Sequence, residues 1–252
     1  MQHFVCSDIH GHMDLFNEIM GFLNEKDSYQ LFMLGDACDR QPFGYEIMIR
    51  LLENPNVVYL KGNHEDMFVR AARSLNDISL EESLSKEELL NQSTSIIHLM
   101  ERTSDMSLYR RNGGAETFKD WIMAGGSMAF VNKIDKLPLF ATYENFDMCH
   151  AGCTRKEWES KDVDSMLWSR NHFFAPWFPD RILIHGHTPI AYLPSYMLKL
   201  SGCNKRWIPV HYYDNSKIDM DTACFTTNVI SLFNLDTEET VTFAEDENHV
   251  NW

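Results

Sequence analysis

The first 65 residues alternate between short apolar runs and amphipathic segments, and this rhythm limits the fold more than any other feature of the sequence. The spacing of apolar residues predicts strands over 3–7, 31–34 and 57–60, and helices over 14–23, 45–52 and 65–75. Strand–helix–strand units at this interval favour right-handed crossovers and a mainly parallel sheet. The sequence pattern by itself therefore predicts an α/β fold.

The remainder of the chain divides into a helical part and a second β part. From about 74 to 136 the pattern is helical and rich in Ser, Glu and Asn, with a turn expected at Asn112-Gly113-Gly114. Strands are expected over 140–142, 147–149, 182–185, 207–213, 229–235 and 239–243, the last two forming a hairpin. We therefore expect one domain over 1–252 with a mainly helical insertion at about 74–136.

Charge and cysteine usage restrict the partners and the compartment. The chain has 22 basic and 37 acidic residues, a formal charge of 22 − 37 = −15, which disfavours nucleic acid and anionic membrane as partners. No apolar run approaches the ~20 residues of a spanning helix, and the N-terminus lacks the pattern of a signal peptide. The six cysteines form no CxxC pair, which favours free thiols in a reducing cytoplasm. We expect a cytoplasmic protein.

Polar residues follow the predicted strands directly. The motifs in order are Asp8-Ile9-His10-Gly11, Gly35-Asp36-Ala37-Cys38-Asp39-Arg40, Gly62-Asn63-His64-Glu65, His150-Ala151-Gly152 and Gly186-His187-Thr188. In open α/β sheets, ligands bind at the carboxyl ends of the strands. Carboxylate, amide and imidazole ligands together suit Mn²⁺, Fe or Zn²⁺. Each motif alone is weak evidence, but their order and spacing together are specific.

The five motifs resemble those of the phosphoprotein phosphatase branch of the calcineurin-like metallophosphoesterases. The likeness is greatest to the small bacterial and bacteriophage Ser/Thr phosphatases, and it extends from Asp8 to about Leu235. It implies a four-layer α/β/β/α sandwich of two mixed sheets. It also implies hydrolysis of phosphate monoesters on phosphorylated protein or on a small phosphorylated substrate.

The resemblance implies a binuclear metal centre, with Mn²⁺ expected and Fe or Zn as alternatives. The implied ligands are Asp8, His10, Asp36, Asn63, His150 and His187. Asp8 and His10 would bind the first ion, Asp36 both, and the others the second. One carboxylate shared by two cations holds them roughly 3.5–4 Å apart, and the ions lower the pKa of bound water.

The resemblance also assigns catalytic and substrate-binding residues. His64 would be the general acid that protonates the leaving group, and Asp39 would orient it. Arg40 and Arg170 would bind the phosphate, because a planar guanidinium pairs with two oxygens at once. His12 is expected to be exposed and His185 to be structural.

Three functions other than phosphomonoester hydrolysis are possible for such motifs. Symmetrical hydrolysis of diadenosine tetraphosphate uses the same metal and arginine pattern, and would be favoured if the basic residues of the insertion faced the cleft. Phosphodiester cleavage is disfavoured because Gly186-His187-Thr188 lacks the second histidine usual in that branch. An inactive scaffold is disfavoured because every expected ligand, the acid and both arginines are present.

Overall fold

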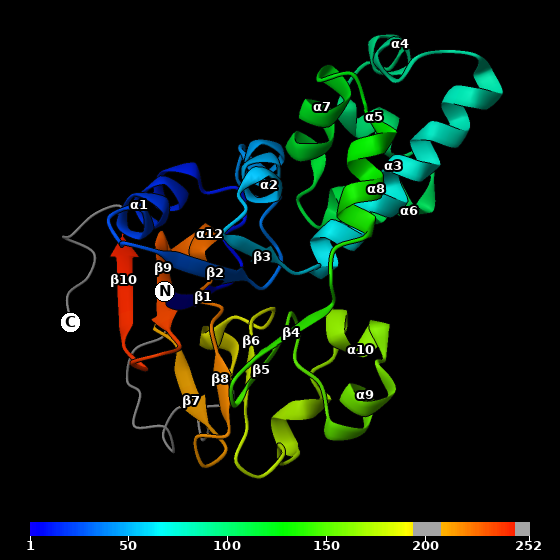
Figure 1. The fold of residues 1–252 in the computed structure, drawn as a ribbon. Helices are drawn as coiled ribbons and strands as arrows, with labels where there is room; N and C mark the ends of the chain where they lie inside the picture. The colour runs from blue at the N-terminus through cyan, green and yellow to red at the C-terminus, as the bar shows by residue number, and fades with distance from the viewer. Residues whose placement is uncertain (194–207, 245–252) are drawn as a thin grey trace.

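The computed structural model describes residues 1–193 and 208–244 of the 252-residue chain. Its framework is a pair of five-stranded sheets (Figure 1). The first sheet has the order β10 (Thr240–Ala244), β9 (Val229–Asn234), β1 (Gln2–Cys6), β2 (Tyr29–Met33), β3 (Val57–Tyr59). The second has the order β4 (Phe140–Tyr143), β5 (Phe146–Cys149), β6 (Ile182–His185), β8 (Lys217–Asp219), β7 (Val210–Tyr212).

Both sheets are mixed, as the resemblance implied. In the first, β1, β2 and β3 are parallel, with Gln2 opposite Tyr29, whereas β9 pairs antiparallel with β1 and with β10. In the second, β5, β6 and β8 are parallel and the outer strands β4 and β7 are antiparallel. The parallel strands bring their carboxyl ends to one edge, where the five motifs lie.

Alternation along the strands produces the layers. On β1, Val5 packs between the sheets with Phe146 of the second sheet, while Phe4 faces the helices of the first. The helices α1 (Met13–Asn24) and α2 (Gly44–Glu53) cover the outer face of the first sheet, and α9 (Arg155–Ser160) and α10 (Val163–Trp168) cover that of the second. This confirms the predicted α/β/β/α sandwich.

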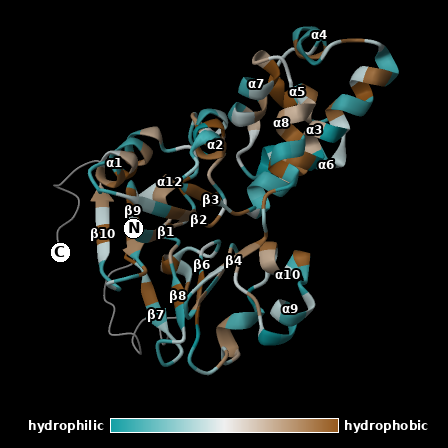
Figure 2. Ribbon diagram, viewed as in Figure 1, coloured by the Kyte–Doolittle hydropathy of each residue, from teal (hydrophilic) through white to brown (hydrophobic). Residues whose placement is uncertain are grey.

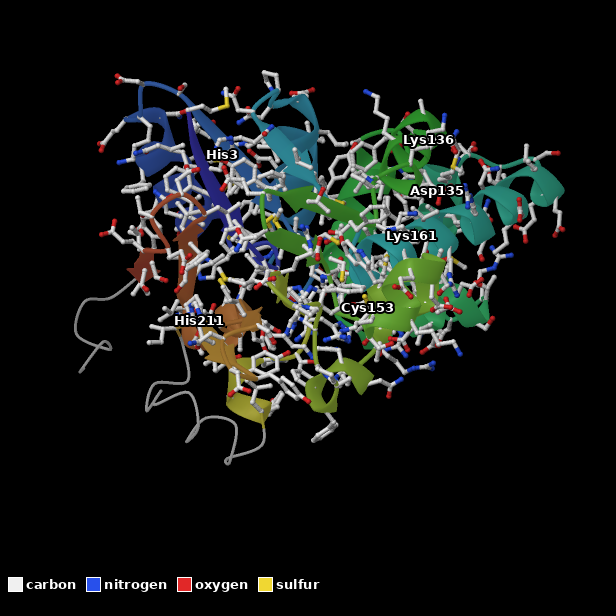
Figure 3. The ribbon with its side chains drawn as sticks, turned by 60° about the horizontal axis from the view of Figure 1, so that its bottom comes forward. His3, Asp135, Lys136, Cys153, Lys161 and His211 are labelled. Carbon is white, nitrogen blue, oxygen red and sulfur yellow. The ribbon has the colours of Figure 1, made fainter. Side chains whose placement is uncertain are left out.

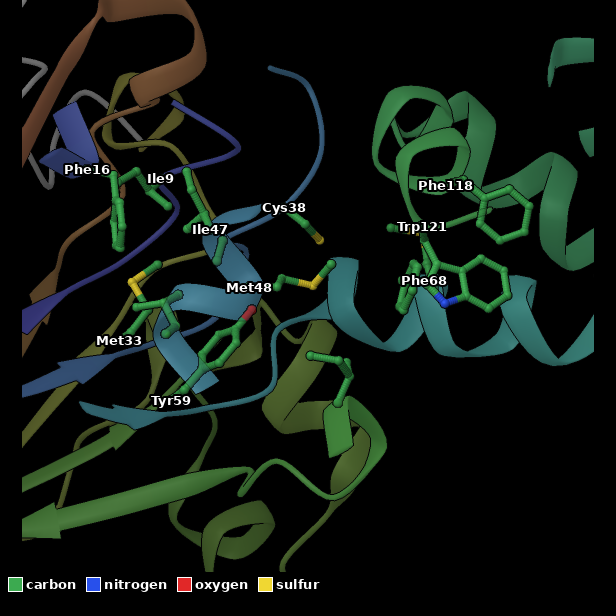
Figure 4. Close-up of a cluster of buried hydrophobic side chains, with 14 of the residues drawn as sticks. Ile9, Phe16, Met33, Cys38, Ile47, Met48, Tyr59, Phe68, Phe118 and Trp121 are labelled. Carbon is green, nitrogen blue, oxygen red and sulfur yellow. The ribbon is translucent and has the colours of Figure 1, made fainter. Parts of the chain in front are cut away.

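Between β3 and β4 the chain forms helices joined by loops. We call this stretch, residues 63–135, the helical segment. The helices are α3 (Asn63–Glu82), α4 (Lys86–Gln92), α5 (Ile96–Met100), α6 (Ser104–Arg111), α7 (Ala115–Met123) and α8 (Met128–Asp135). Hydrophobic and hydrophilic residues alternate along them (Figure 2). Phe68, Phe118 and Trp121 pack together in their interior, with Cys38 and Met48 between them and the first sheet (Figure 4).

Ion pairs attach the end of the helical segment to the sandwich. Asp135, at the end of α8 (Figure 3), accepts hydrogen bonds from Lys61, just after β3, and from Arg73 of α3. The Lys61 Nζ–Asp135 Oδ1 distance is 3.1 Å, and the lysine is buried. Partial burial makes this pair more persistent than an exposed one, so α8, α3 and the end of β3 are held in fixed relation.

Several details differ from the sequence expectations, among them the helices α9 and α10, which were not expected. The strand β8 was not expected, and His12 is 7% exposed, hence buried and not exposed. The helix α3 begins at Asn63, two residues earlier than expected, so Asn63 and His64 lie in its first turn. The strand expected over 207–213 is shorter, and its first residue, Trp207, lies outside the described residues. Among the helices of the described ranges, none combines the length and apolarity needed to span a bilayer.

Candidate metal centre

The predicted metal ligands converge at the carboxyl ends of β1 and β2 in the first sheet and of β5 and β6 in the second, in the loops that follow these strands. Asp8 follows β1, Asp36 follows β2, His150 follows β5 and His187 follows β6. The backbone of Asp8, His10, Asp36 and His187 is left-handed, with φ values of 56°, 48°, 52° and 68°. Such conformations are uncommon outside glycine and gather at functional sites, where the surrounding structure imposes them.

The first cluster consists of His10, Asp36 and His64, whose ligand atoms lie within 4.8 Å of one another. His10 Nδ1 lies 3.0 Å from the Cys38 carbonyl oxygen and donates to it, so the Nε2 lone pair faces Asp36 Oδ2 at 3.8 Å. Burial, with the charges of His64 and Arg40, holds the pKa of His10 well below its usual range. His10 is therefore a neutral imidazole with its lone pair directed at a carboxylate.

The second cluster consists of Asp36, His150 and His187. His150 Nδ1 donates to the Leu34 carbonyl oxygen at 2.8 Å, which leaves its Nε2 as an acceptor 2.8 Å from Asn63 Oδ1. His187 Nδ1 also lies 2.8 Å from Asn63 Oδ1, and burial lowers the pKa of His187. The acceptors His150 Nε2 and Asn63 Oδ1 face each other at a distance that a bound cation would satisfy. A pair of divalent ions sharing Asp36 fits this arrangement, with His10 beside one position and Asn63, His150 and His187 around the other.

Asp8 lies beside these clusters, outside the two sets of donor atoms. Its carboxylate accepts hydrogen bonds from the Ser7 hydroxyl and from the His187 amide, the latter at 3.0 Å. Burial raises the pKa of Asp8 to about 6, and the charge of Asp36 reinforces the rise. A Cβ atom at Gly186 would lie 2.0 Å from Asp8 Oδ2, so only glycine allows this approach. Ligation by Asp8 stays a prediction.

His64 forms a buried dyad with Asp39. Its Nδ1 lies 2.7 Å from Asp39 Oδ2, and its Nε2 lies 3.4 Å from Arg40 Nη2 and 3.8 Å from Asp36 Oδ2. Burial disfavours the imidazolium, but the charge of Asp36 and the contacts with Asp39 outweigh it and raise the pKa of His64 to about 8. A protonated ring is a poor metal ligand and a good acid, so His64 differs from His10 in the chemistry it offers.

The two predicted phosphate arginines occupy different sides of the centre. Arg40 is exposed, and its guanidinium carbon lies 4.1 Å from the centroid of the Phe225 ring of α12 (Cys224–Thr227). Arg170 is exposed just before the 3₁₀ helix η1 (Asn171–Phe174), and its charge is one cause of the lowered pKa of His187. The structure thus brings Arg40 to the acid and Arg170 towards His187.

Glu65 is a central residue of the site to which the sequence interpretation gave no role. It is fully buried, and its carboxylate accepts from the amides of Asp36 (2.8 Å), Ala37 (2.9 Å) and Gly62 (2.8 Å) and from the Tyr59 hydroxyl (2.7 Å). It therefore ties the loop after β2 to the loop after β3. A glutamate at the third position of a helix that opens without a polar N-cap side chain was a usable signal.

Other histidines and aromatic residues near the centre have structural roles. His185, expected to be structural, contacts the Gly186 carbonyl oxygen through Nδ1 and the Tyr212 hydroxyl through Nε2, at 3.0 and 2.7 Å. The sequence interpretation missed Phe225 beside Arg40, and no motif pointed to it. Trp168 is 37% exposed, with its ring centroid 6.0 Å from that of His187.

A sandwich of two mixed sheets with two histidine clusters sharing one carboxylate is the architecture of a metallophosphoesterase. Residues 1–215 match the family of calcineurin-like phosphoesterases, and the chain belongs to that family. It is a family of dimetal phosphoesterases, so the protein is a metal-dependent phosphoric ester hydrolase.

Solved structures support the fold at low sequence identity. A candidate diadenosine tetraphosphatase has a TM-score of 0.58 at 14% identity, with 96% of this chain and 92% of that chain covered. A metallophosphoesterase from Sphaerobacter thermophilus has a TM-score of 0.52 at 13% identity, with coverages of 98% and 89%. A protein serine/threonine phosphatase from Saccharomyces cerevisiae has a TM-score of 0.52 at 13% identity, with coverages of 98% and 81%. No functionally curated protein matches the chain by sequence.

Proposed function

We propose that this protein is a phosphomonoesterase that hydrolyses phosphoserine and phosphothreonine in protein substrates, with Mn²⁺ as its metal. Asp8, His10, Asp36, Asn63, His150 and His187 would hold two ions, with Fe or Zn as alternatives to Mn²⁺. Bound there, the ions would supply Lewis-acid activation of water and of the phosphoryl oxygens. The roles below belong to the chain's own residues.

The observation that supports this proposal most strongly is the His64–Asp39 dyad. Serine and threonine leave as alkoxides, whose high basicity requires a proton from a general acid. His64 Nδ1 is engaged by Asp39 at 2.7 Å, so Nε2 is the nitrogen that can deliver a proton into the site. Metal ions on Asp36 would weaken that residue's effect on His64, whereas the direct contacts with Asp39 would persist. Asp39 is therefore the partner that keeps His64 protonated.

Arg40 and Arg170 would orient the phosphate. The Phe225 ring restrains the Arg40 guanidinium at 4.1 Å, which reduces the side-chain freedom that phosphate binding would otherwise remove. The Arg40 Nη2 atom lies 3.4 Å from His64 Nε2, so an oxygen bound by Arg40 is close to the acid. This proximity suits transfer of a proton to the ester oxygen of a bound monoester.

The basic residues of the helical segment favour a protein substrate over a dinucleotide polyphosphate. Arg102 pairs with Glu82, Arg110 with Glu101 and Lys119 with Glu116, at distances up to 3.7 Å. The fourth basic residue, Arg111, donates to the Ser107 hydroxyl. Because three of these four cations already have an acidic partner on the same segment, little positive charge is left for a chain of bridging phosphates. An extended peptide with one phosphate needs only the centre itself.

Hydrolysis of diadenosine tetraphosphate is the second candidate. The likeness to a candidate diadenosine tetraphosphatase, with 92% of that chain covered, keeps it in consideration, although at 14% identity such a likeness concerns the fold alone. The two functions share the metal ligands and the acid. They differ in whether the surface accepts adenine rings and additional phosphates.

The test is a comparison of kcat/KM for a phosphothreonine peptide and for diadenosine tetraphosphate at equal Mn²⁺. We expect the peptide to be preferred. A hundredfold preference for the dinucleotide, worth ~2.7 kcal/mol of transition-state binding, would replace the proposed substrate and leave the metal mechanism intact. The His64→Asn variant should lower kcat on the peptide by roughly 10²–10⁴-fold without loss of metal. Metal loss in that variant would make His64 a ligand.

We further propose that the protein works in the reducing cytoplasm. Cys6, Cys38, Cys149 and Cys153 are buried free thiols, and Cys203 lies outside the described residues. The Sγ atoms of Cys149 and Cys153 are 4.0 Å apart without a bond between them. Neighbouring cysteines that are thiols and not a disulfide would be typical of a reducing compartment.

A further inference from the structure

Asp39 of the acid dyad and the predicted phosphate-binding Arg40 lie in a stretch of uncommon backbone conformation. Asp39 and Arg40 are consecutive residues with φ of 72° and 66°, both in the left-handed region. L-residues with side chains rarely adopt this region, and two in succession need external support. Asp39 is also fully buried, so its polar groups require partners within the protein.

Three hydrogen bonds from the helical segment provide that support. The Asp39 amide donates to Thr117 Oγ1 at 3.1 Å, and the Arg40 amide donates to the Gly113 carbonyl oxygen at 3.1 Å. The Tyr109 hydroxyl donates to Asp39 Oδ1, the carboxylate oxygen that His64 does not use. The end of α6, the turn after it and the start of α7 therefore hold the backbone of both residues and the free half of the Asp39 carboxylate.

Tyr109 is fixed in place by its own surroundings. It is fully buried, and its ring meets those of Phe68 and Phe118 edge-on, with centroids 6.1 and 6.0 Å away. The turn that follows α6 requires glycine at both positions: Gly113 has φ of 93°, and a Cβ on Gly114 would lie 2.4 Å from the Tyr109 ring. The hydroxyl thus has one direction available to it, towards Asp39.

We propose that Tyr109 and Thr117 are positioning residues of the phosphatase reaction, and that the helical segment completes the acid by fixing Asp39 and, through it, His64. This inference rests on the proposed function, since it concerns the acid of that reaction. With both carboxylate oxygens engaged, Asp39 cannot rotate about its terminal bond, and His64 Nε2 keeps its direction into the site. Without the Tyr109 hydroxyl, one oxygen loses its partner and the carboxylate is free to turn.

The test uses Tyr109→Phe and Thr117→Val in the full chain, loaded with Mn²⁺ and assayed on two monoesters. On a phosphothreonine peptide we expect Tyr109→Phe to lower kcat roughly tenfold, or about 1.4 kcal/mol in the barrier, with KM unchanged. On p-nitrophenyl phosphate, whose leaving group needs little protonation, we expect less than about a twofold loss. Thr117→Val should also lower kcat more on the peptide than on p-nitrophenyl phosphate, by a smaller factor than Tyr109→Phe.

Tyr45→Phe is the matched control, since Tyr45 of α2 packs its ring against Phe130 of α8, centroids 5.0 Å apart, and should behave as wild type. Equal losses on both monoesters in Tyr109→Phe would indicate general damage and overturn the inference, as would no loss on either. A second readout, taken on metal-free protein because paramagnetic Mn²⁺ would broaden the signal, is the downfield imidazole N–H proton resonance identified by its absence in His64→Asn. It should weaken or shift in Tyr109→Phe, and an unchanged resonance counts against the inference. If the wild type cleaves neither monoester, the proposed function fails and this resonance alone decides.

Discussion

The substitution Glu65→Gln tests the residue whose carboxylate joins the loop after β2 to the loop after β3 by hydrogen bonds. The substitution keeps the shape of the side chain but turns one carboxylate oxygen into an NH₂ group, which donates where an acceptor is needed. Oε1 accepts from the Ala37 amide and the Tyr59 hydroxyl, and Oε2 accepts from the amides of Asp36 and Gly62. Whichever way the new amide group is turned, at least one buried donor is therefore left without an acceptor.

The two orientations differ in which donors they orphan. With NH₂ in place of Oε2, two buried backbone amides lose their acceptor. With NH₂ in place of Oε1, the Tyr59 hydroxyl can rotate to accept, and the donors that lose their acceptor are the Ala37 amide and the weakly donating Cys38 thiol. The second orientation is favoured, and one orphaned amide plus loss of charge assistance in the remaining bonds costs about 2–4 kcal/mol. For a chain of this size that corresponds to a fall in Tm of roughly 4–16 °C.

Thermal unfolding of EDTA-treated protein, followed by circular dichroism, measures this loss without a contribution from metal binding. Glu81→Gln on the exposed side of the same helix α3 is the control, and its stability should change by no more than about 0.5 kcal/mol. If Glu65→Gln unfolds together with this control, the four hydrogen bonds do not carry the assigned energy and the reasoning is wrong.

Two further predictions concern the metal centre and the phosphate. Wild-type protein loaded with Mn²⁺ should hold two ions per chain by elemental analysis, and Asp36→Asn should weaken both, because Asp36 belongs to both clusters; a single tightly held ion in the wild type would contradict the binuclear arrangement. Replacing Arg40 or Arg170 with Ala should lower kcat/KM and weaken inhibition by inorganic phosphate, with only partial recovery in the Lys variants, since an ammonium cannot make a two-pronged contact. Unchanged phosphate inhibition in Arg170→Ala would remove that residue from the phosphate site.

The first βαβ units were predictable from sequence because their information is local. Apolar runs of strand length, helical spacing and the polar residues between them all lie within a few residues of one another. The parallel pairing of β1, β2 and β3 then places Asp8, Asp36 and Asn63 at one edge. The order of the five motifs, compared with a known family, supplied the rest of the candidate ligand set and the two-sheet architecture.

The strand β8 and the role of Tyr109 could not be predicted in this way, because both depend on distant contacts. β8 is only three residues long and begins at Lys217, which reads as a surface residue. Its ammonium is instead buried and donates to the carbonyl oxygens of His172 and Ala175. Tyr109 reads as a core aromatic, and its partner Asp39 lies 70 residues away in sequence. Neither contact leaves a pattern in the neighbouring residues.

Two arrangements at the metal centre are unfavourable on their own: the left-handed backbone of the loops and the close spacing of the ligand atoms. Each depends on the hydrogen bonds that surround the centre. Six site residues have left-handed backbone (Asp8, His10, Asp36, Asp39, Arg40 and His187), and at about 1–2 kcal/mol each they cost roughly 6–12 kcal/mol. That sum is comparable to the whole stability of a typical domain, about 5–15 kcal/mol, so the backbone must be restrained from outside the loops. Glu65 restrains Asp36, Thr117 of α7 restrains Asp39, and Gly113 of the preceding turn restrains Arg40. The strained loops in turn direct the Nε2 lone pair of His150 at Asn63 Oδ1 and bring His187 Nδ1 to the same oxygen, an arrangement that a bound cation would stabilise. Metal affinity and the rigidity of the surrounding hydrogen bonds are therefore linked, because any change that lets the loops relax also lets the ligands turn away from the metal.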